Sequence, residues 1–121
     1  MDPQLSEFNY YFCTFQSFPD SLFSKALGTF REKEGWTLIL EEKDLPTNCT
    51  KSKAQSLITL TVYSDLQAVG FLAAISKAIA EAGISINVIS GYYHDHIFIP
   101  QEFATKTMAI LHRIQEENSL K

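Results

Sequence analysis

Long hydrophobic runs are absent from the 121-residue sequence. No apolar stretch approaches the ~18 residues that a membrane-spanning helix needs. The first twelve residues, MDPQLSEFNYYF, lack the basic start and the apolar core of a secretory signal. We therefore expect a cytoplasmic protein with no membrane partner.

Clusters of basic residues are absent as well. The ten Lys and Arg residues are scattered, and fourteen Asp and Glu residues bring the formal net charge to −4. A nucleic-acid-binding surface usually carries a basic patch, so nucleic acid is not an expected partner. No run of like charge indicates an interaction tail.

Cysteine is scarce: Cys13 and Cys49 are the two in the sequence. They lie far apart, and an intracellular setting would keep both thiols reduced. Cys13 lies in a segment that predicts a buried strand, and no histidine is near it in the sequence to act as its base. No other catalytic signature is present. We therefore predict that the protein is not an enzyme and uses no cofactor.

The first half of the sequence instead predicts short strands. They are expected over residues 9–16, 27–32 and 36–41. Glu34-Gly35 is typical of a hairpin tip, because glycine tolerates the positive φ of such turns. The charged segment 42–55, which contains Pro46, is read as a linker. We expect an N-terminal β-rich lobe over residues 1–50 and a second lobe over residues 51–121.

The second half carries the strongest pattern. Apolar and polar residues alternate over 57–63, which indicates a strand. An apolar stripe at helical spacing predicts a helix over 68–82, and Gly83 ends it. Strands are then expected at 84–89 and 97–99, and a last helix is expected to begin at Pro100.

This order, β-α-β-β-α, is a ferredoxin-like split βαβ unit that lacks its fourth strand. Because the tail 115–121 is polar, no strand is expected to follow. We expect the strand at 9–16 to fill the empty edge. The predicted fold class is α+β, with a ferredoxin-like βαββα unit packed with the N-terminal β-rich lobe.

The stretch SDLQAVGFLAAISKAIAEAGISINVISGYYHDHIFIP, residues 64–100, resembles the ACT-domain family. Its AVG turn, its helix ending in AGIS and its GYYHDH hairpin together resemble small stand-alone proteins with an ACT-type C-terminal half. The segment TFREKEGWTLIL, residues 29–40, resembles the first lobe of the same proteins. The resemblance covers about residues 9–114 and implies that both lobes are ACT-like.

The resemblance implies a non-catalytic regulatory module that binds a small ligand, most often an amino acid, and passes the signal to an enzyme. It also implies a ligand site at the turn between a strand and a helix, and on the facing strand. The turn consists of Asp65, Leu66, Gln67, Ala68, Val69 and Gly70. The facing strand contributes Asn87 and Ile89.

These residue types suit that chemistry. N–H groups at the start of a helix attract an anion such as an α-carboxylate, and Asp65 offers the opposite charge to an ammonium group. Gly70 leaves room for a ligand. The same residues also fit a structural role, in which Asp65 caps the helix and Gly70 permits packing. Asn87 could hold a ligand or bond to the neighbouring lobe.

His94, Asp95 and His96 form the sharpest local pattern. In a strand the two histidines share one side and Asp95 takes the other. They could bind zinc or another first-row metal, act on a ligand or a proton, or form a solvated hairpin whose turn Asp95 stabilises. No third metal ligand is evident, so we assign no metal.

The two polar turns, 64–70 and 91–96, should lie at the same end of the sheet. They follow the first and second strands of the split βαβ unit, and these strands run parallel. We therefore expect one shared pocket that includes the three residues of the His-Asp-His hairpin. Two alternatives stay open: a homodimerisation or protein-interaction module without a ligand, and a small metal-binding protein that uses the hairpin. A homodimer is expected in the first interpretation as well.

Overall fold

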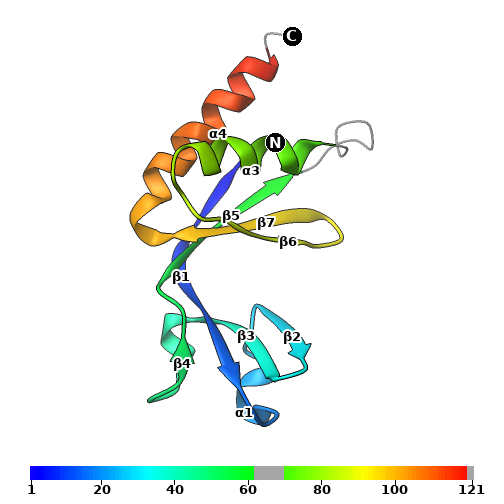
Figure 1. Cartoon of the computed structure of the whole chain (residues 1–121), viewed down its shortest axis with the longest axis vertical. Coiled ribbons are helices and arrows are strands. Elements are labelled where there is room, and N and C mark those ends of the chain that lie inside the picture. The colour runs from blue at the N-terminus through cyan, green and yellow to red at the C-terminus, as the bar shows by residue number, and fades with distance from the viewer. Residues whose placement is uncertain (62–69, 120–121) are drawn as a thin grey trace. The chain divides into compact units, whose positions relative to one another are not determined.

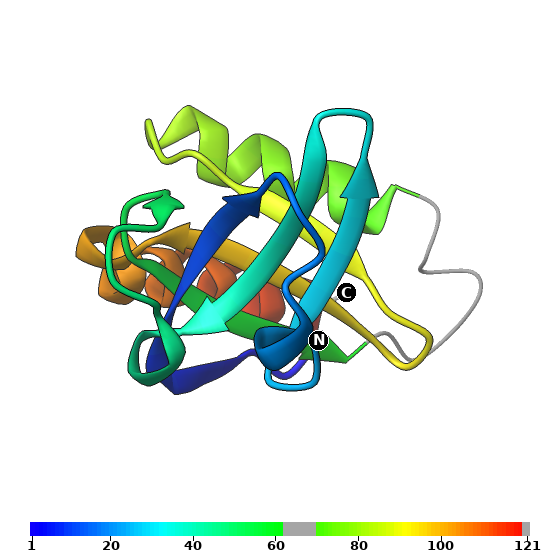
Figure 2. The ribbon, with the colours of Figure 1, turned by 90° about the horizontal axis from the view of Figure 1, so that it is seen from below.

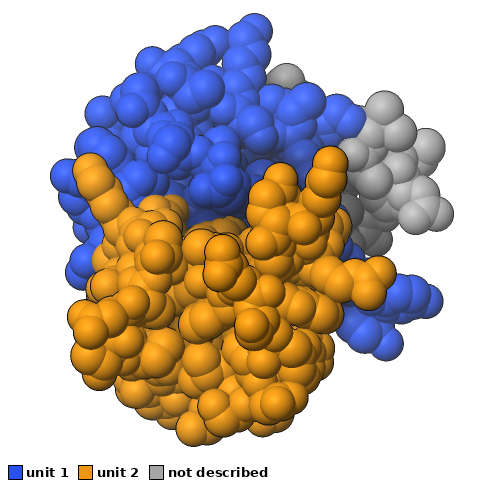
Figure 3. All heavy atoms as spheres, turned by 60° about the horizontal axis from the view of Figure 1, so that its bottom comes forward, with its two compact units in different colours: residues 1–7, 56–121 blue, residues 8–55 orange. Residues whose placement is uncertain are grey.

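The computed structural model of the chain describes residues 1–61 and 70–119. By their internal contacts the residues form two compact units, which Figure 3 shows in different colours. Unit 1 contains Met1–Glu7 and Ser56–Lys121, and unit 2 contains Phe8–Gln55. The first residues of the chain thus belong with its second half. The division after residue 50 stays a prediction.

Unit 2 is built on antiparallel strands. They are β1 (Gln4–Phe15), β2 (Gly28–Glu32), β3 (Gly35–Glu41) and β4 (Thr50–Lys51). β3 lies between β2 and β1, and β4 also pairs with β1. The β2–β3 hairpin, cyan in Figure 2, turns at Gly35 as predicted. Gly35 has a φ of +155°, and a Cβ there would collide with the Phe15 carbonyl oxygen, so the turn requires glycine.

The core of unit 2 is small. Cys13, Leu38 and Leu40 are its fully buried members. Trp36 packs against them from the same face of β3, because side chains alternate along a strand. The one-turn helix α1 (Asp20–Phe23) and the 3₁₀ turn η1 (Glu42–Asp44) complete the unit.

Unit 1 is a sheet covered by helices on one face (Figure 1). Its strands β5 (Gln55–Thr61), β6 (Asn87–Ser90) and β7 (His94–Pro100) lie in the order β1-β5-β7-β6. The helices are α3 (Phe71–Glu81) and α4 (Ala104–Ser119), and the 3₁₀ turn η2 (Gln101–Phe103) leads into α4.

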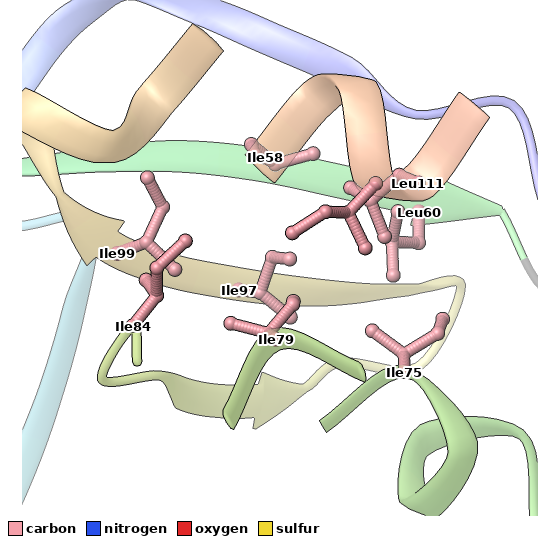
Figure 4. Packing of buried hydrophobic residues seen from close by; sticks show 9 residues of the cluster. Ile58, Leu60, Ile75, Ile79, Ile84, Ile97, Ile99 and Leu111 are labelled. Carbon is pink, nitrogen blue, oxygen red and sulfur yellow. The ribbon is translucent and has the colours of Figure 1, made fainter. Parts of the chain in front are cut away.

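The core of unit 1 lies between this sheet and the two helices. Every second residue of β5 and β7 points to the helices, as Figure 4 shows for Ile58, Leu60, Ile97 and Ile99. The other members of the cluster are Ile75, Ile79, Ile84, Ile110 and Leu111. The α+β, ferredoxin-like fold class is confirmed.

Several predicted boundaries need correction. The strand expected at 97–99 is β7, which begins at His94, inside the segment predicted as a polar turn. An N-terminal strand does lie beside β5, but β1 begins at Gln4, and its residues 10–15 pair with β3 instead. The polar start of the chain is ordered because the Met1 carbonyl accepts a hydrogen bond from the Thr61 N–H at 2.8 Å. The strand expected at 84–89 is β6, which begins at Asn87, three residues later.

The last boundary concerns Pro100, which ends β7 instead of starting a helix. Its φ of −56° and ψ of 136° are extended values that a proline ring accepts as readily as helical ones. The chain then passes through η2 before α4 begins at Ala104.

Candidate functional site

Five of the eleven predicted site residues, Asp65, Leu66, Gln67, Ala68 and Val69, lie outside the described residues. Gly70 is described, and it directly precedes α3 with a φ of +80°. Among the described residues, no atom beyond its chain neighbours and the backbone of α3 lies within 4 Å of the position that a Cβ would take there. The left-handed backbone at this position favours glycine.

The β6–β7 hairpin brings four predicted residues to one face of the unit 1 sheet. Ile89 lies opposite His96 in the antiparallel register, and Asn87 lies opposite Phe98. Because side chains alternate along a strand, His94, His96 and Phe98 point away from the face on which Ile97 and Ile99 meet the helices. We call Asn87, Ile89, His94 and His96 the hairpin-face group.

Thr59 from β5 reaches the same group. Its Oγ1 lies 3.2 Å from Nδ1 of His96. Thr59 is not among the predicted site residues. The signal that could have found it is its position between Ile58 and Leu60, which places it on the sheet face opposite the helices.

His96 is half-buried, and this changes its proton affinity. Burial lowers the pKa of His96, a positive charge on His94 lowers it further, and the Asp95 carboxylate partly opposes both effects. The two imidazole ring centroids are 6.2 Å apart. His96 is therefore a neutral hydrogen-bonding group at pH 7, held at one nitrogen by Thr59.

Asp95 lies on the other face, opposite Ser90 of β6. The division of the His-Asp-His pattern between two faces follows the prediction from strand geometry. The turn before it is closed by a 2.8 Å hydrogen bond from the Gly91 N–H to the His94 carbonyl. Tyr92 and Tyr93 at this turn are exposed, with their ring centroids 4.9 Å apart.

Across residues 1–61 and 70–119, no group of three or more His, Cys, Asp or Glu side chains could hold a metal ion. The histidines of the hairpin thus have no third protein ligand among the described side chains. None of the described helices is long and apolar enough to cross a membrane.

Comparison with known proteins identifies related sequences and structures. A family described as ACT domain matches residues 53–113, and a second family with the same description matches residues 1–45. No curated protein matches the chain.

Among solved structures, a Vibrio cholerae protein of unknown function, described as a possible transport protein, is 43% identical. The match covers 92% of this chain and 87% of that one, with a TM-score of 0.83. An Agrobacterium tumefaciens protein is 15% identical over 87% of this chain and 81% of that one, with a TM-score of 0.76.

The ligand-free regulatory subunit of aspartate kinase from Thermus thermophilus shares the fold. It is 10% identical over 93% of this chain and 97% of that one, with a TM-score of 0.63.

Proposed function

Since the chain belongs to the ACT-domain family, we propose that it is a regulatory module for a small amino-acid-type ligand. In this proposal the protein has no catalytic activity of its own and acts in the cytoplasm, where ligand binding changes its effect on a partner enzyme.

The hairpin-face group is the observation that carries this proposal. It combines an amide, two imidazoles and one aliphatic side chain on a single sheet face. An amino acid presents a carboxylate, an ammonium group and a side chain. The imidazoles and the Asn87 amide offer hydrogen bonds to the polar groups, and Ile89 offers an apolar contact, with about 40% of its surface exposed.

The turn before α3 supplies the remaining contacts in this proposal. N–H groups in the first turn of an α-helix favour an anion, and α3 is long enough, at 11 residues, to carry that dipole. Asp65 would pair with the ammonium group. Leu66, Gln67, Ala68, Val69 and Gly70 would line the rest of the ligand site.

A thermal-shift screen against the twenty amino acids tests ligand binding. A ligand at ~100 times its Kd stabilises the folded protein by roughly 2.7 kcal/mol. We expect at least one amino acid to raise the Tm, and His94→Ala to remove that rise. His112→Ala on the exposed side of α4 is the matched control and should keep it. A panel without any shift would overturn the proposal.

A protein-interaction module without a ligand is the second candidate. β6 is the edge strand of the unit 1 sheet, its sequence NVIS carries no charge, and Val88 is partly exposed. Such an edge can pair with another strand, including β6 of a second copy. Sedimentation velocity should then show a dimer that Val88→Lys converts to a monomer. A wild-type monomer at all concentrations would remove this candidate.

A further inference from the structure

We propose that Cys13 and Cys49 are a site of reversible oxidation, at which a low-molecular-weight disulfide converts the two thiols into one intramolecular disulfide. The site lies wholly within unit 2 and does not depend on the function proposed above.

The fold brings these two cysteines together from distant parts of the sequence. Cys13 on β1 lies opposite Lys51 on β4, and Cys49 precedes Lys51 by two residues. Cys49 packs against the cluster of Cys13, Leu38 and Leu40, and its thiol is close enough to raise the pKa of Cys13. Both thiols are free. The two cysteines of the sequence are therefore contact partners.

The two thiols differ in access. Cys13 is only 1% exposed, and its Sγ also lies 3.7 Å from the Tyr11 carbonyl oxygen. Cys49 is half-buried and follows directly after the turn at Thr47 and Asn48. The Cys49 thiol is thus the one that an oxidant can reach, and Cys49 lies between the turn and the start of β4.

The reactivity of the two thiols predicts the same order of attack, with Cys49 first and Cys13 second. The pKa of the Cys13 thiol is raised to about 12, chiefly by burial and also by the neighbouring Cys49, while Lys51 opposes this. The thiolate is the nucleophile, so Cys13 is inert toward a first attack at neutral pH. Once Cys49 is bound in a mixed disulfide, its thiol no longer raises the pKa of Cys13.

The reaction balances in two exchange steps. The Cys49 thiolate attacks one sulfur of an oxidant R–S–S–R, forms Cys49–S–S–R and releases one RS⁻. The Cys13 thiolate then attacks the Cys49 sulfur, forms Cys13–S–S–Cys49 and releases the second RS⁻. Two protein thiols lose two electrons and two protons, and the oxidant becomes two RSH. A thiol reductant reverses both steps.

Native protein treated with glutathione disulfide tests this proposal by intact mass and non-reduced peptide mapping. We expect a glutathione adduct on Cys49 first, and then a chain two hydrogens lighter than the reduced protein with a Cys13–Cys49 peptide pair. The second step should be up to roughly 100-fold faster at pH 9 than at pH 7, because the thiolate fraction below the pKa rises tenfold per pH unit.

Variants that lack one cysteine test the role of each thiol by itself. Cys13→Ala should keep a stable adduct on Cys49 at both pH values, and Cys49→Ala should take up no glutathione. The wild-type peptide map decides the question even where a variant fails to fold. A Cys49 adduct that persists in the wild type at pH 9, or a disulfide between two chains, would overturn the proposal.

Discussion

The two units of the chain bury their hydrophobic side chains in different ways. In unit 1, nine buried side chains from two strands, two helices and the segment before β6 form one cluster. In unit 2, three buried side chains form the cluster around Cys13, with partly buried neighbours. Unit 2 has one helix of four residues, and Phe18 and Phe23 beside Trp36 stay exposed.

This difference shows where the stability of the chain comes from. Burial of apolar area is the dominant favourable term in folding, and a unit as short as residues 8–55 can bury little of it. Unit 2 depends on β1, which pairs with both β3 and β4. Unit 1 depends on the same strand at its other end, where β1 lies beside β5. We therefore expect the shared strand to matter most.

The largest effect is expected from deleting residues 1–7. The deletion removes Met1, which packs on the unit 1 core, and its hydrogen bond to Thr61. Burying a Met side chain fully is worth about 1.5–3 kcal/mol and each hydrogen bond about 1. Because Met1 is partly buried and the deletion also removes the first residues of β1, which lies beside β5, the free energy of unfolding should fall by roughly 5 kcal/mol only if several β1–β5 hydrogen bonds of about 1 kcal/mol each are lost as well. Urea denaturation measures this. Leu5→Ala, at an exposed position of the same segment, is the control. An unchanged urea midpoint would show that residues 1–7 do not stabilise unit 1.

An intermediate effect is expected from core truncation, compared between the units. Leu111→Ala in unit 1 and Leu38→Ala in unit 2 both remove fully buried side chains. Such changes cost about 2–5 kcal/mol, and the cost grows with the cavity that remains. Leu111 should lie at the upper end because the surrounding cluster is larger. Denaturation curves of the two variants give the difference. A greater loss for Leu38 would reverse the comparison.

The smallest effect is expected from the pH dependence of the hairpin-face group. The pKa of His96 is lowered in the folded protein by burial and by His94. The unfolded chain therefore binds more protons as the pH falls. The contribution of His96 to stability is complete above pH ~6.5 and is lost as the pH falls through the folded pKa.

Thermal unfolding between pH 7.5 and 5 measures this slope. We expect His96→Gln to reduce the stability lost between pH 7.5 and 5 by less than about 1 kcal/mol, because the imidazole keeps part of its solvent contact. His112→Gln at an exposed position should leave the slope unchanged. A steeper fall in the His96 variant would contradict the assigned direction.

The sequence predicts the strands, the helices and their faces well where the pattern is periodic. The alternation around Ile58 and Leu60 and the helical stripe with Ile75 and Ile79 both match the buried cluster. The start of the chain is harder to predict, because a polar segment such as Gln4–Glu7 gains its structure from pairing with β5 and not from its own pattern.

The candidate site is only partly readable from the sequence. Strand geometry predicts the separation of His94 and His96 from Asp95, because it depends on local alternation. The contact between Thr59 and His96 depends on the order of β5 and β7 in the sheet. The local sequence around either residue does not predict this order. The contact between Cys13 and Cys49 depends likewise on the pairing of β1 with β4.

β1 is also a single strand that can report on both units. It has 12 residues, and the residues at its two ends belong to different units. Amide hydrogen exchange along this strand would therefore measure the local stability of both units. Residues near Gln4 would follow the opening of unit 1, and residues near Phe15 would follow unit 2, so this one strand can reveal whether the units open together.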